Sequence, residues 1–263
     1  MFHIKQAMKN GEALIGIMIE EMTTPNIAKI LAACGFKYFI IDCEHGSFND
    51  ETVASIISVA KGSGIIPMVR VPEIRKDTIS KPLEAGAMGL LIPQIKTVDD
   101  VKRVVKEARY APLGNRGISH TKPHNNYVTK SDPEQTKKEN DEVMIILQIE
   151  TKEAIENLDE ILSVEGIDAI LIGPNDLSQS YGILGQFDNP IILQAFDKVI
   201  EVSKKHDIIS GVHFGDIKTL KKWAQKGMRL LMWNTEIGLI IENGIKGVDN
   251  LVESLKSHGI NCL

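Results

Sequence analysis

The stretch VMIILQIETKEAIENLDEILSVEGIDAILIGPND (residues 143–176) contains one complete strand–helix–strand pattern. An apolar run at 143–149 precedes apolar residues at helical spacing over 152–162, and a second apolar run follows at 168–173. Continuous apolar runs are typical of strands buried on both faces of a parallel sheet, and the helix between them supplies the crossover that parallel strands need. The stretch therefore predicts an α/β fold.

The same pattern extends over the whole chain. Helical spacing recurs at 51–61, after Asn49-Asp50, and at 98–108, while Thr24-Pro25 is a further candidate helix start. Eight strands with intervening helices favour a closed (β/α)8 TIM barrel, with an open doubly wound sheet as the alternative. We see no linker, so we expect residues 1–263 to form a single barrel domain. The expected strands are 13–19, 37–42, 65–70, 89–93, 143–149, 168–173, 208–213 and 229–233.

Composition indicates an ordinary globular protein. The 263 residues are 43% hydrophobic and 25% charged, with a net charge of −5, which gives no sign of a nucleic-acid surface. The apolar runs are too short to span a membrane, and the N-terminus lacks a signal-peptide core. Cys34, Cys43 and Cys262 show no CxxC spacing, so we expect a cytoplasmic protein without structural zinc. Cys43 lies between Asp42 and Glu44, which disfavour a nucleophilic thiolate.

Residues 110–142 break the pattern. They are polar, contain three prolines and include the run EQTKKENDE, and they are too long for a simple connector. Three interpretations stay open for this segment: a lid, an oligomer contact or a disordered insertion.

Residues able to do chemistry follow most of the expected strands. In a parallel barrel all eight carboxyl ends open on one face, which is where active sites lie. The opposite strand ends carry Lys37, Asp168 and Arg229, which we expect to be ordinary solvated charges. The residues at the carboxyl ends are Asp42, Glu44 and His45, Arg70, Gln148 and Glu150, Gly173 to Asp176, His213, and Asn234 to Glu236.

Glu150 and Asp176 follow neighbouring strands, so their carboxylates can converge. Two carboxylates without a convergent Cys or His set suit a hard cation, Mg²⁺ or Mn²⁺, with positions left open for water and substrate. The alternative is that each carboxylate only caps the helix that follows. Placement on adjacent strands favours the metal site.

Arg70 ends an apolar strand, where an unpaired guanidinium would be costly to bury. It needs an anionic partner, either a substrate carboxylate or a structural acid. Asp42 and His45 are three residues apart in a turn, close enough for the carboxylate to orient the imidazole and raise its basicity. We expect His45 to be a general base, the alternative being a structural histidine.

The turn Gly173-Pro174-Asn175-Asp176 joins a strand to a helix. The amides of Asn175 and Asp176 would be free at the helix start, where a carboxylate is favoured, and the glycine lets a ligand approach the backbone. None of the expected strands ends in a lysine that could form a Schiff base, so metal chemistry is favoured over imine chemistry.

At these residues the chain resembles the HpcH/HpaI aldolase family of metal-dependent 2-oxo-3-deoxy acid aldolases. The similar segments run in order from residue 13 to residue 182, and the remaining eighty or so residues match only in pattern. The segments are FIIDCEHGSFND (39–50), PMVRVP (67–72), EAGAMGLLIPQIKTVDDVKRVVKEARYAPLGNRG (84–117), LQIETKEAIENLDEIL (147–162) and VEGIDAILIGPNDLSQSYG (164–182).

The resemblance implies a TIM barrel of the phosphoenolpyruvate/pyruvate-binding type and a site for a small 2-oxo acid. Glu150 and Asp176 would hold Mg²⁺ or Mn²⁺, with Co²⁺ a further candidate. Arg70 would polarise the substrate, His45 and Asp42 would form a catalytic pair, and Gln148 would lie beside the substrate. Gly173, Pro174 and the amides of Asn175 and Asp176 would hold the substrate carboxylate. Relatives are typically hexamers, trimers of dimers, so a segment at about 236–263 would pack on a neighbouring subunit.

The chain departs from the family pattern at Met18 to Glu21, at 120–130 and at Trp233 to Glu236. Relatives use these positions in the distal pocket, so the aldehyde half of the substrate stays open, as do the roles of His213, Trp233 and Glu236.

The resulting hypothesis is a class II aldolase. It cleaves a 4-hydroxy-2-oxo acid, of the 2-keto-3-deoxy sugar acid or 2,4-dihydroxyhept-2-enedioate type, to pyruvate and an aldehyde through a metal-stabilised enolate. His45 would take the proton of the C4 hydroxyl. The alternatives are a malyl-CoA or citramalyl-CoA type of 3-hydroxyacyl-CoA lyase, and a non-catalytic barrel that binds 2-oxo acids.

Overall fold

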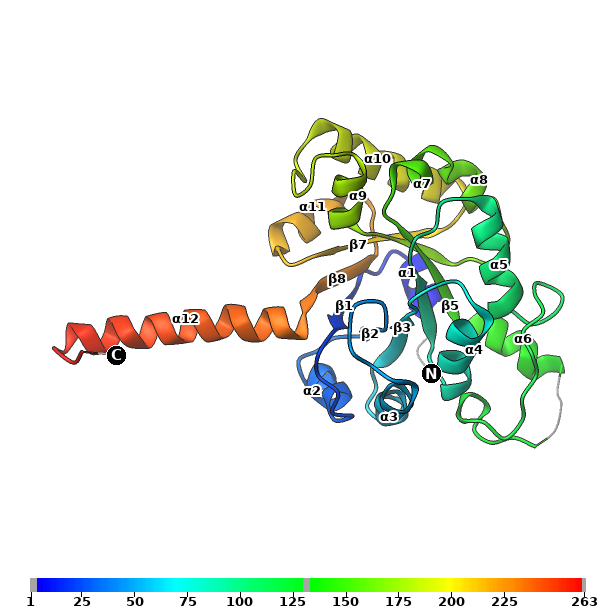
Figure 1. Cartoon of the computed structure of the whole chain (residues 1–263), viewed down its shortest axis with the longest axis horizontal. Coiled ribbons are helices and arrows are strands. Elements are labelled where there is room, and N and C mark those ends of the chain that lie inside the picture. Colours follow the sequence, from blue (N-terminus) through cyan, green and yellow to red (C-terminus); the bar gives the residue numbers. More distant parts are fainter. Residues whose placement is uncertain (1–3, 130–132, 262–263) are drawn as a thin grey trace.

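Eight parallel strands close into one barrel in chain order, and β8 pairs with β1 to complete it (Figure 1). The structure is a computed structural model that describes residues 4–129 and 133–261. The closed barrel confirms the predicted fold and excludes the open sheet. The strands are β1 (Leu14–Ile19), β2 (Tyr38–Asp42), β3 (Ile66–Arg70), β4 (Gly89–Ile92), β5 (Met144–Ile149), β6 (Ala169–Ile172), β7 (Ile209–Phe214) and β8 (Leu230–Thr235).

Helices surround the barrel where the periodicity predicts them. Asn49 caps α3 by accepting a hydrogen bond from the Thr52 amide at 2.8 Å. The expected helix at 152–162 is divided at Asn157, and Thr24 and Pro25 form a turn before a helix rather than its start. The helices are α1 (Ile4–Lys9), α2 (Ile27–Ala33), α3 (Asp50–Lys61), α4 (Lys76–Ala85), α5 (Val98–Ala108), η1 (Pro123–Asn125), α6 (Pro133–Glu142), α7 (Lys152–Glu156), α8 (Leu158–Leu162), α9 (Pro174–Ser180), α10 (Pro190–Lys205), α11 (Ile217–Lys226) and α12 (Glu236–Ser257).

The core has two layers because successive strand residues point to opposite faces of the sheet. Ile40 and Met68 belong to the cluster inside the barrel, whereas their neighbours Ile41 and Val69 belong to the cluster between the sheet and the helices. Both faces of each strand are therefore apolar, which explains the continuous apolar runs in the sequence.

A glycine and a tyrosine share one space inside the barrel. Gly16 on β1 pairs in register with Tyr38 on β2, and a Cβ atom at position 16 would overlap the Tyr38 ring. The tyrosine is fully buried, and its hydroxyl has no hydrogen-bond partner among the described residues. The absent side chain at Gly16 is what makes room for the ring.

Helix α1 closes the amino end of the barrel, where the strands begin. Ile4 and Met8 pack into the interior cluster. Lys5 lies 2.7 Å from Asp168 at the start of β6, and Arg109 pairs with the same carboxylate. The expectation that Asp168 is an ordinary solvated charge is therefore wrong, because the carboxylate joins three separate elements of the fold.

Residues 110–142 connect the end of α5 with the start of β5, so their described parts lie at the amino end of the barrel. Arg116 stacks over the Tyr110 ring at 4.6 Å, and His124 Nδ1 lies 3.3 Å from the Glu84 carbonyl oxygen at the end of α4. For the described residues 110–129 and 133–142, the lid interpretation is wrong for the chain's own barrel, because they lie on the side opposite the strand carboxyl ends. Likewise, Pro123 and His124 contact the carboxyl ends of α3 and α4 rather than the carboxyl ends of the strands.

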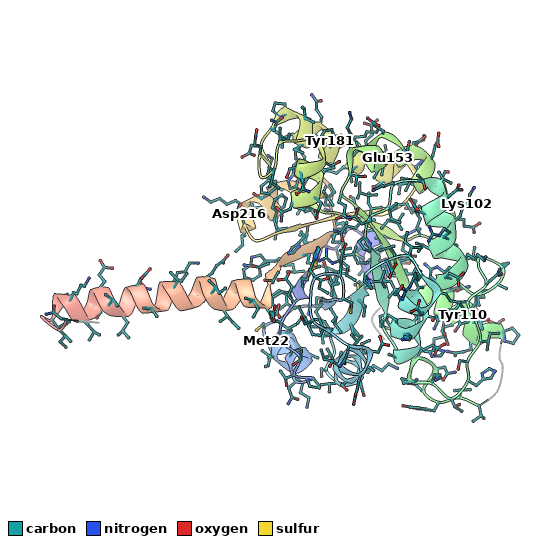
Figure 2. All side chains as sticks on the ribbon, viewed as in Figure 1. Met22, Lys102, Tyr110, Glu153, Tyr181 and Asp216 are labelled. Carbon is teal, nitrogen blue, oxygen red and sulfur yellow. The ribbon has the colours of Figure 1, made fainter. Side chains whose placement is uncertain are left out.

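Helix α12 runs out from β8 away from the barrel, and beyond its first turn its side chains project into solvent (Figures 1 and 2). Its apolar face is exposed by 51 to 61% per residue. Among the described helices, none combines the length and the hydropathy needed to cross a membrane. The residues of this apolar face are Ile240, Ile241, Ile245, Val248 and Leu251.

Candidate active site

The candidate site is the top layer of the barrel interior. Because side chains alternate along a strand, the residue two positions beyond an interior residue also faces inward. Toward the carboxyl end of each strand, the inward-facing residues change from apolar to polar. We call this end of the barrel the mouth. The inward-facing residues that lead to the mouth are Met18 and Glu20 along β1, Ile40 and Asp42 along β2, Met68 and Arg70 along β3, and Ile146, Gln148 and Glu150 along β5, with Glu20 and Glu150 directly after their strands.

Arg70 and Asp42 form a buried bidentate ion pair at the mouth. The two residues are in register across β2 and β3. Arg70 Nε and Nη2 donate to the two Asp42 oxygens at 2.8 and 2.6 Å, and Nη1 lies 3.1 Å from a Glu44 oxygen. Burial opposes the charge of Asp42, but the hydrogen bonds from Arg70 prevail and lower its pKa. The guanidinium is thus held in one orientation, with its charge shared between two acids.

Asp42 has a different role from the expected one. Its carboxylate accepts hydrogen bonds from the backbone amides of Glu44 and His45, at 3.0 and 3.3 Å, and both of its oxygens bind Arg70. The carboxylate therefore fixes the turn that carries His45, and no hydrogen bond to the imidazole itself is found among the described residues. The His45 side chain is exposed at the mouth, close enough to Glu20 and Glu44 to affect the pKa of each.

Glu150 is a deeply buried carboxylate, only 1% exposed. It accepts a hydrogen bond from the Gln94 amide at 2.7 Å and another from the Gln148 side-chain amide. Burial and the nearby Asp176 carboxylate raise the pKa of Glu150 to about 7. Within the described chain no basic side chain lies within ion-pair distance of Glu150, so its negative charge has no direct partner.

Gly173 allows this crowded arrangement. It follows β6, and a Cβ atom there would lie 2.9 Å from a Glu150 oxygen and 3.0 Å from the Gln148 amide nitrogen. Gly173 also caps α9, with Pro174 in the first position of that helix. The amides of Asn175 and Asp176 therefore fall in the first turn, where backbone N–H groups have no acceptor within the helix. This is the arrangement predicted for the Gly173-Pro174-Asn175-Asp176 turn.

The residues present fit a hard divalent cation. Gln148 Oε1 is buried and has no hydrogen-bond partner in the described structure. Together with the carboxylates of Glu150 and Asp176, it supplies only oxygen donors, which Mg²⁺ and Mn²⁺ prefer. The described residues contain no group of three His, Cys, Asp or Glu side chains arranged to hold an ion. A cation here would therefore keep coordination positions open for substrate.

Glu236 is a residue whose role the sequence did not reveal. It is 3% exposed, and its carboxylate accepts hydrogen bonds from the backbone amides of Glu20, Glu21 and Met22, at 2.7 to 3.0 Å. This contact holds the loop after β1 against the start of α12, near the labelled Met22 (Figure 2). The alternation of inward-facing residues along β1 could have indicated that Glu20 faces the mouth. No local sequence pattern, however, links Glu20 to Glu236.

His213 and Trp233 are the other two residues without an assigned role. Burial lowers the pKa of His213 to about 4, so its ring is neutral at pH 7 and adds no charge to the mouth. Its Nε2 atom lies 3.1 Å from the Asn234 carbonyl oxygen. Trp233 donates its indole N–H to the Gly215 carbonyl oxygen at 3.0 Å. Both contacts connect the end of β7 with the end of β8.

Comparison with known proteins identifies the family. The family model for HpcH/HpaI aldolase/citrate lyase matches residues 18–243. The chain is 30% identical to a 4-hydroxy-2-oxo-heptane-1,7-dioate aldolase from Escherichia coli, over 85% of this chain and 84% of that protein. It is also 30% identical to a 2-keto-3-deoxy-L-rhamnonate aldolase from Escherichia coli O17:K52:H18, over 95% and 88% of the two chains.

A solved structure agrees with this assignment. The crystal structure of an HpcH/HpaI aldolase from Desulfitobacterium hafniense DCB-2 has a TM-score of 0.91 to this chain at 30% identity, covering 96% of this chain and 98% of that one. The resemblance inferred from the sequence motifs is confirmed. The chain, a lyase built on a closed (β/α)8 barrel, belongs to the HpcH/HpaI aldolase/citrate lyase family.

Proposed function

We propose that this protein is a class II aldolase that cleaves a 4-hydroxy-2-oxo acid to pyruvate and an aldehyde. The names of its relatives support the reaction class, since these proteins act on 2-oxo or keto-deoxy acids. The observation that carries the proposal is the pairing of a buried, uncompensated Glu150 with the unpartnered oxygen of Gln148. Leaving such groups without a partner is costly, which supports a site for a cation and an oxygen-rich ligand.

Glu150 and Asp176 would hold the cation, Mg²⁺ or Mn²⁺. When bound, the cation would act as a Lewis acid on the ketone oxygen of the substrate. Arg70 would act on the same oxygen from the end of β3.

Arg70 would stabilise the negative charge that develops on the ketone oxygen when the C3–C4 bond breaks. Asp42 and Glu44 hold its guanidinium in place before the substrate arrives, so little reorganisation is needed during the reaction. The free amides of Asn175 and Asp176 would bind the substrate carboxylate, which the positive end of a helix favours.

His45 would accept the proton of the C4 hydroxyl and release the aldehyde. Its position on the turn fixed by Asp42 supports this role, because the turn lies at the mouth beside Arg70. Asp42 would act as a positioning residue for the turn and for Arg70. This replaces the carboxylate–imidazole pair expected from sequence.

The test separates chemistry from binding. Mass spectrometry would follow deuterium incorporation into the pyruvate methyl group in D₂O with Mg²⁺, with EDTA, and after Mg²⁺ is restored. We expect exchange only with the metal present, and pyruvate release from 4-hydroxy-2-oxo acids with the same dependence. Exchange and cleavage that persist in EDTA would contradict metal dependence. Their absence under any metal would instead indicate the non-catalytic binder, and saturable binding of free CoA would indicate a thioester lyase.

Matched variants make the test specific to the site. Glu150→Gln keeps the size of the side chain and removes its charge, so exchange should fall sharply. Glu153→Gln removes the same charge from an exposed position on α7 and should have no effect (Figure 2). Equal effects of the two variants would argue against Glu150 as a metal ligand.

We also propose that α12 packs on a second copy of the chain in a homo-oligomer, a hexamer arranged as a trimer of dimers. The exposed apolar face of α12 supports this, because a continuous apolar stripe on a helix is typical of an interface. Light scattering of the full chain measures the assembly. Ile245→Asp with Leu251→Asp should reduce it to smaller species, and an unchanged mass would contradict the proposal.

A further inference from the structure

The loop after β1 brings an additional carboxylate, Glu20, to the mouth. Ile19 is in register with Ile41, so Glu20 comes next to Asp42 at the end of the neighbouring strand. Glu20 also continues the interior column of Leu14 and Met18 on β1. By the alternation of side chains, Glu20 therefore faces the space above the barrel interior.

The backbone of Glu20 is held on both sides. Both Glu236 oxygens accept hydrogen bonds from its amide, at 2.9 and 3.0 Å. Its carbonyl oxygen adjoins Gly46, where a Cβ atom would come within 2.7 Å of it. Gly46 follows His45, so the loop rests directly on the turn that carries the proposed base. The side chain of Glu20 therefore projects from a fixed backbone.

The Glu20 carboxylate itself is left without a partner. It is partly buried, and among the described residues it accepts no hydrogen bond and forms no ion pair. Arg70 at the end of β3 has N–H groups that are already bound by Asp42 and Glu44. A half-buried acceptor of this kind is suited to a donor supplied by a ligand.

The position of Glu20 indicates which part of the ligand it meets. The groups proposed to hold pyruvate come from β3, β5 and the turn after β6. His45, which acts on the C4 hydroxyl, and Glu20 come from the ends of β2 and β1. The aldehyde half of the substrate would therefore extend from His45 toward Glu20.

We propose that Glu20 sets the charge selectivity of the aldehyde half: it accepts a hydrogen bond from a hydroxyl of a neutral hydroxyaldehyde and repels an aldehyde that carries its own carboxylate. Glu236 is the positioning residue that keeps Glu20 there. This inference rests on the proposed aldolase function. It narrows the substrate class to 4-hydroxy-2-oxo acids whose far end is hydroxylated and uncharged.

The experiment measures kcat/KM for addition of pyruvate to glycolaldehyde and to succinate semialdehyde, with Mg²⁺. For the full-length wild-type protein we expect glycolaldehyde to be preferred by tenfold or more, on the order of what one like charge nearby contributes in a partly screened site. Added NaCl should raise the rate with succinate semialdehyde and leave that with glycolaldehyde nearly constant, because salt screens the repulsion. A wild-type preference for succinate semialdehyde, or no salt effect on it, would overturn the inference.

Substitutions at Glu20 and Glu21 test whether Glu20 causes the preference between the two aldehydes. Glu20→Gln should raise kcat/KM for succinate semialdehyde about tenfold. Glu21→Gln is the matched control, since it removes the same charge from the next, exposed position and should leave the preference unaltered. An unaltered preference in Glu20→Gln, or an equal shift in Glu21→Gln, would overturn the inference.

Glu236→Gln tests the positioning role. A glutamine can accept hydrogen bonds at only one of the two oxygen positions, so the Glu20 amide loses part of its anchor. We expect the KM for glycolaldehyde to rise with little change in kcat, and the double variant with Glu20→Gln to show no further change in preference. Additive effects on the preference would show that Glu236 acts independently and overturn its positioning role. Wild-type protein that exchanges no pyruvate protons would overturn the proposed function itself, a result distinct from exchange with an unaltered preference.

Discussion

Two carboxylates at opposite ends of the barrel have contrasting surroundings. Asp168, at the amino end, binds Lys5 and Arg109 and accepts a hydrogen bond from the Ile145 amide at 2.8 Å. Glu150, at the carboxyl end, has only amide donors and is more deeply buried. The first charge is compensated within the fold, whereas the second has no basic side chain within ion-pair distance among the described residues.

This difference shows that charged residues at the two ends of the barrel serve different purposes. Charges at the amino end join α1, α5 and β6 and contribute to stability, while charges at the carboxyl end are left able to interact with a ligand. Substitutions at the two ends should therefore change different measurements, activity at one end and the free energy of unfolding at the other.

The largest expected effect is on activity, at the mouth. Arg70→Ala removes the guanidinium that we propose stabilises the developing oxyanion, and kcat/KM for pyruvate release should fall by ~10²–10³ or more. Arg70→Lys should lose most of this activity as well, because an ammonium cannot reproduce the bidentate pair with Asp42. Near-normal turnover in Arg70→Ala would contradict its role, and a urea unfolding curve would verify that each variant is folded.

The second effect is on stability, at the amino end. Asp168→Ala leaves Arg109, which is 2% exposed, without its anionic partner, so the free energy of unfolding in urea should fall by about 3 kcal/mol. Activity per folded molecule should stay within about twofold, as this end has no catalytic role. Asp197→Ala is the control, because it breaks an exposed pair with Lys226 and should cost less than about 1 kcal/mol. A loss of activity without a loss of stability in Asp168→Ala would contradict the assignment of stability to the amino end and activity to the carboxyl end.

A smaller effect is expected from Gly173→Ala. The added methyl group would lie 2.9 Å from a Glu150 oxygen, so the carboxylate must shift. Activity should fall about tenfold at saturating Mg²⁺, since small misplacements of site groups are costly. Gly62→Ala, whose new methyl would meet its nearest neighbour at an ordinary 3.9 Å, should leave activity unchanged. Full activity in Gly173→Ala would mean that Glu150 need not occupy its present position.

The smallest effect is expected at Cys43, beside the mouth. Burial, followed by the nearby Asp42 carboxylate, raises the pKa of the Cys43 thiol to about 12, so below that pH the unreactive thiol predominates. Alkylation of Cys43 by iodoacetamide, followed by peptide mapping, should accelerate about tenfold per pH unit from pH 7 to 10 without a plateau. Cys43→Ser should keep activity within about twofold. A plateau near pH 8, or a large loss in Cys43→Ser, would identify a functional thiolate.

The fold was predictable because strands that are buried on both faces appear in the sequence as continuous apolar runs. Strand bounds agree with the expected ones to within two residues, and the largest difference lies at β8, which continues through the polar residues Asn234 and Thr235. The division at Asn157 was not predictable, because the apolar spacing continues across it.

The position of the polar residues at the mouth was predictable from the sequence, but their pairings were less so. Asp42 had a local candidate partner, His45, and a partner 28 residues away, Arg70, and only the register of β2 and β3 reveals that Arg70 takes both of its oxygens. The bond between the Glu20 amide and Glu236 spans 216 residues. Contacts at such separations depend on barrel closure, which periodicity along the chain does not encode.

The shared space of Gly16 and Tyr38 constrains how this protein can diverge. Any side chain at position 16 requires the ring at position 38 to shrink or move first, while a small residue at 38 alone would leave a void beside the glycine. Neither order of single changes is neutral, so the two positions should evolve as a pair, and a hybrid of two relatives joined between β1 and β2 would inherit an incompatible combination.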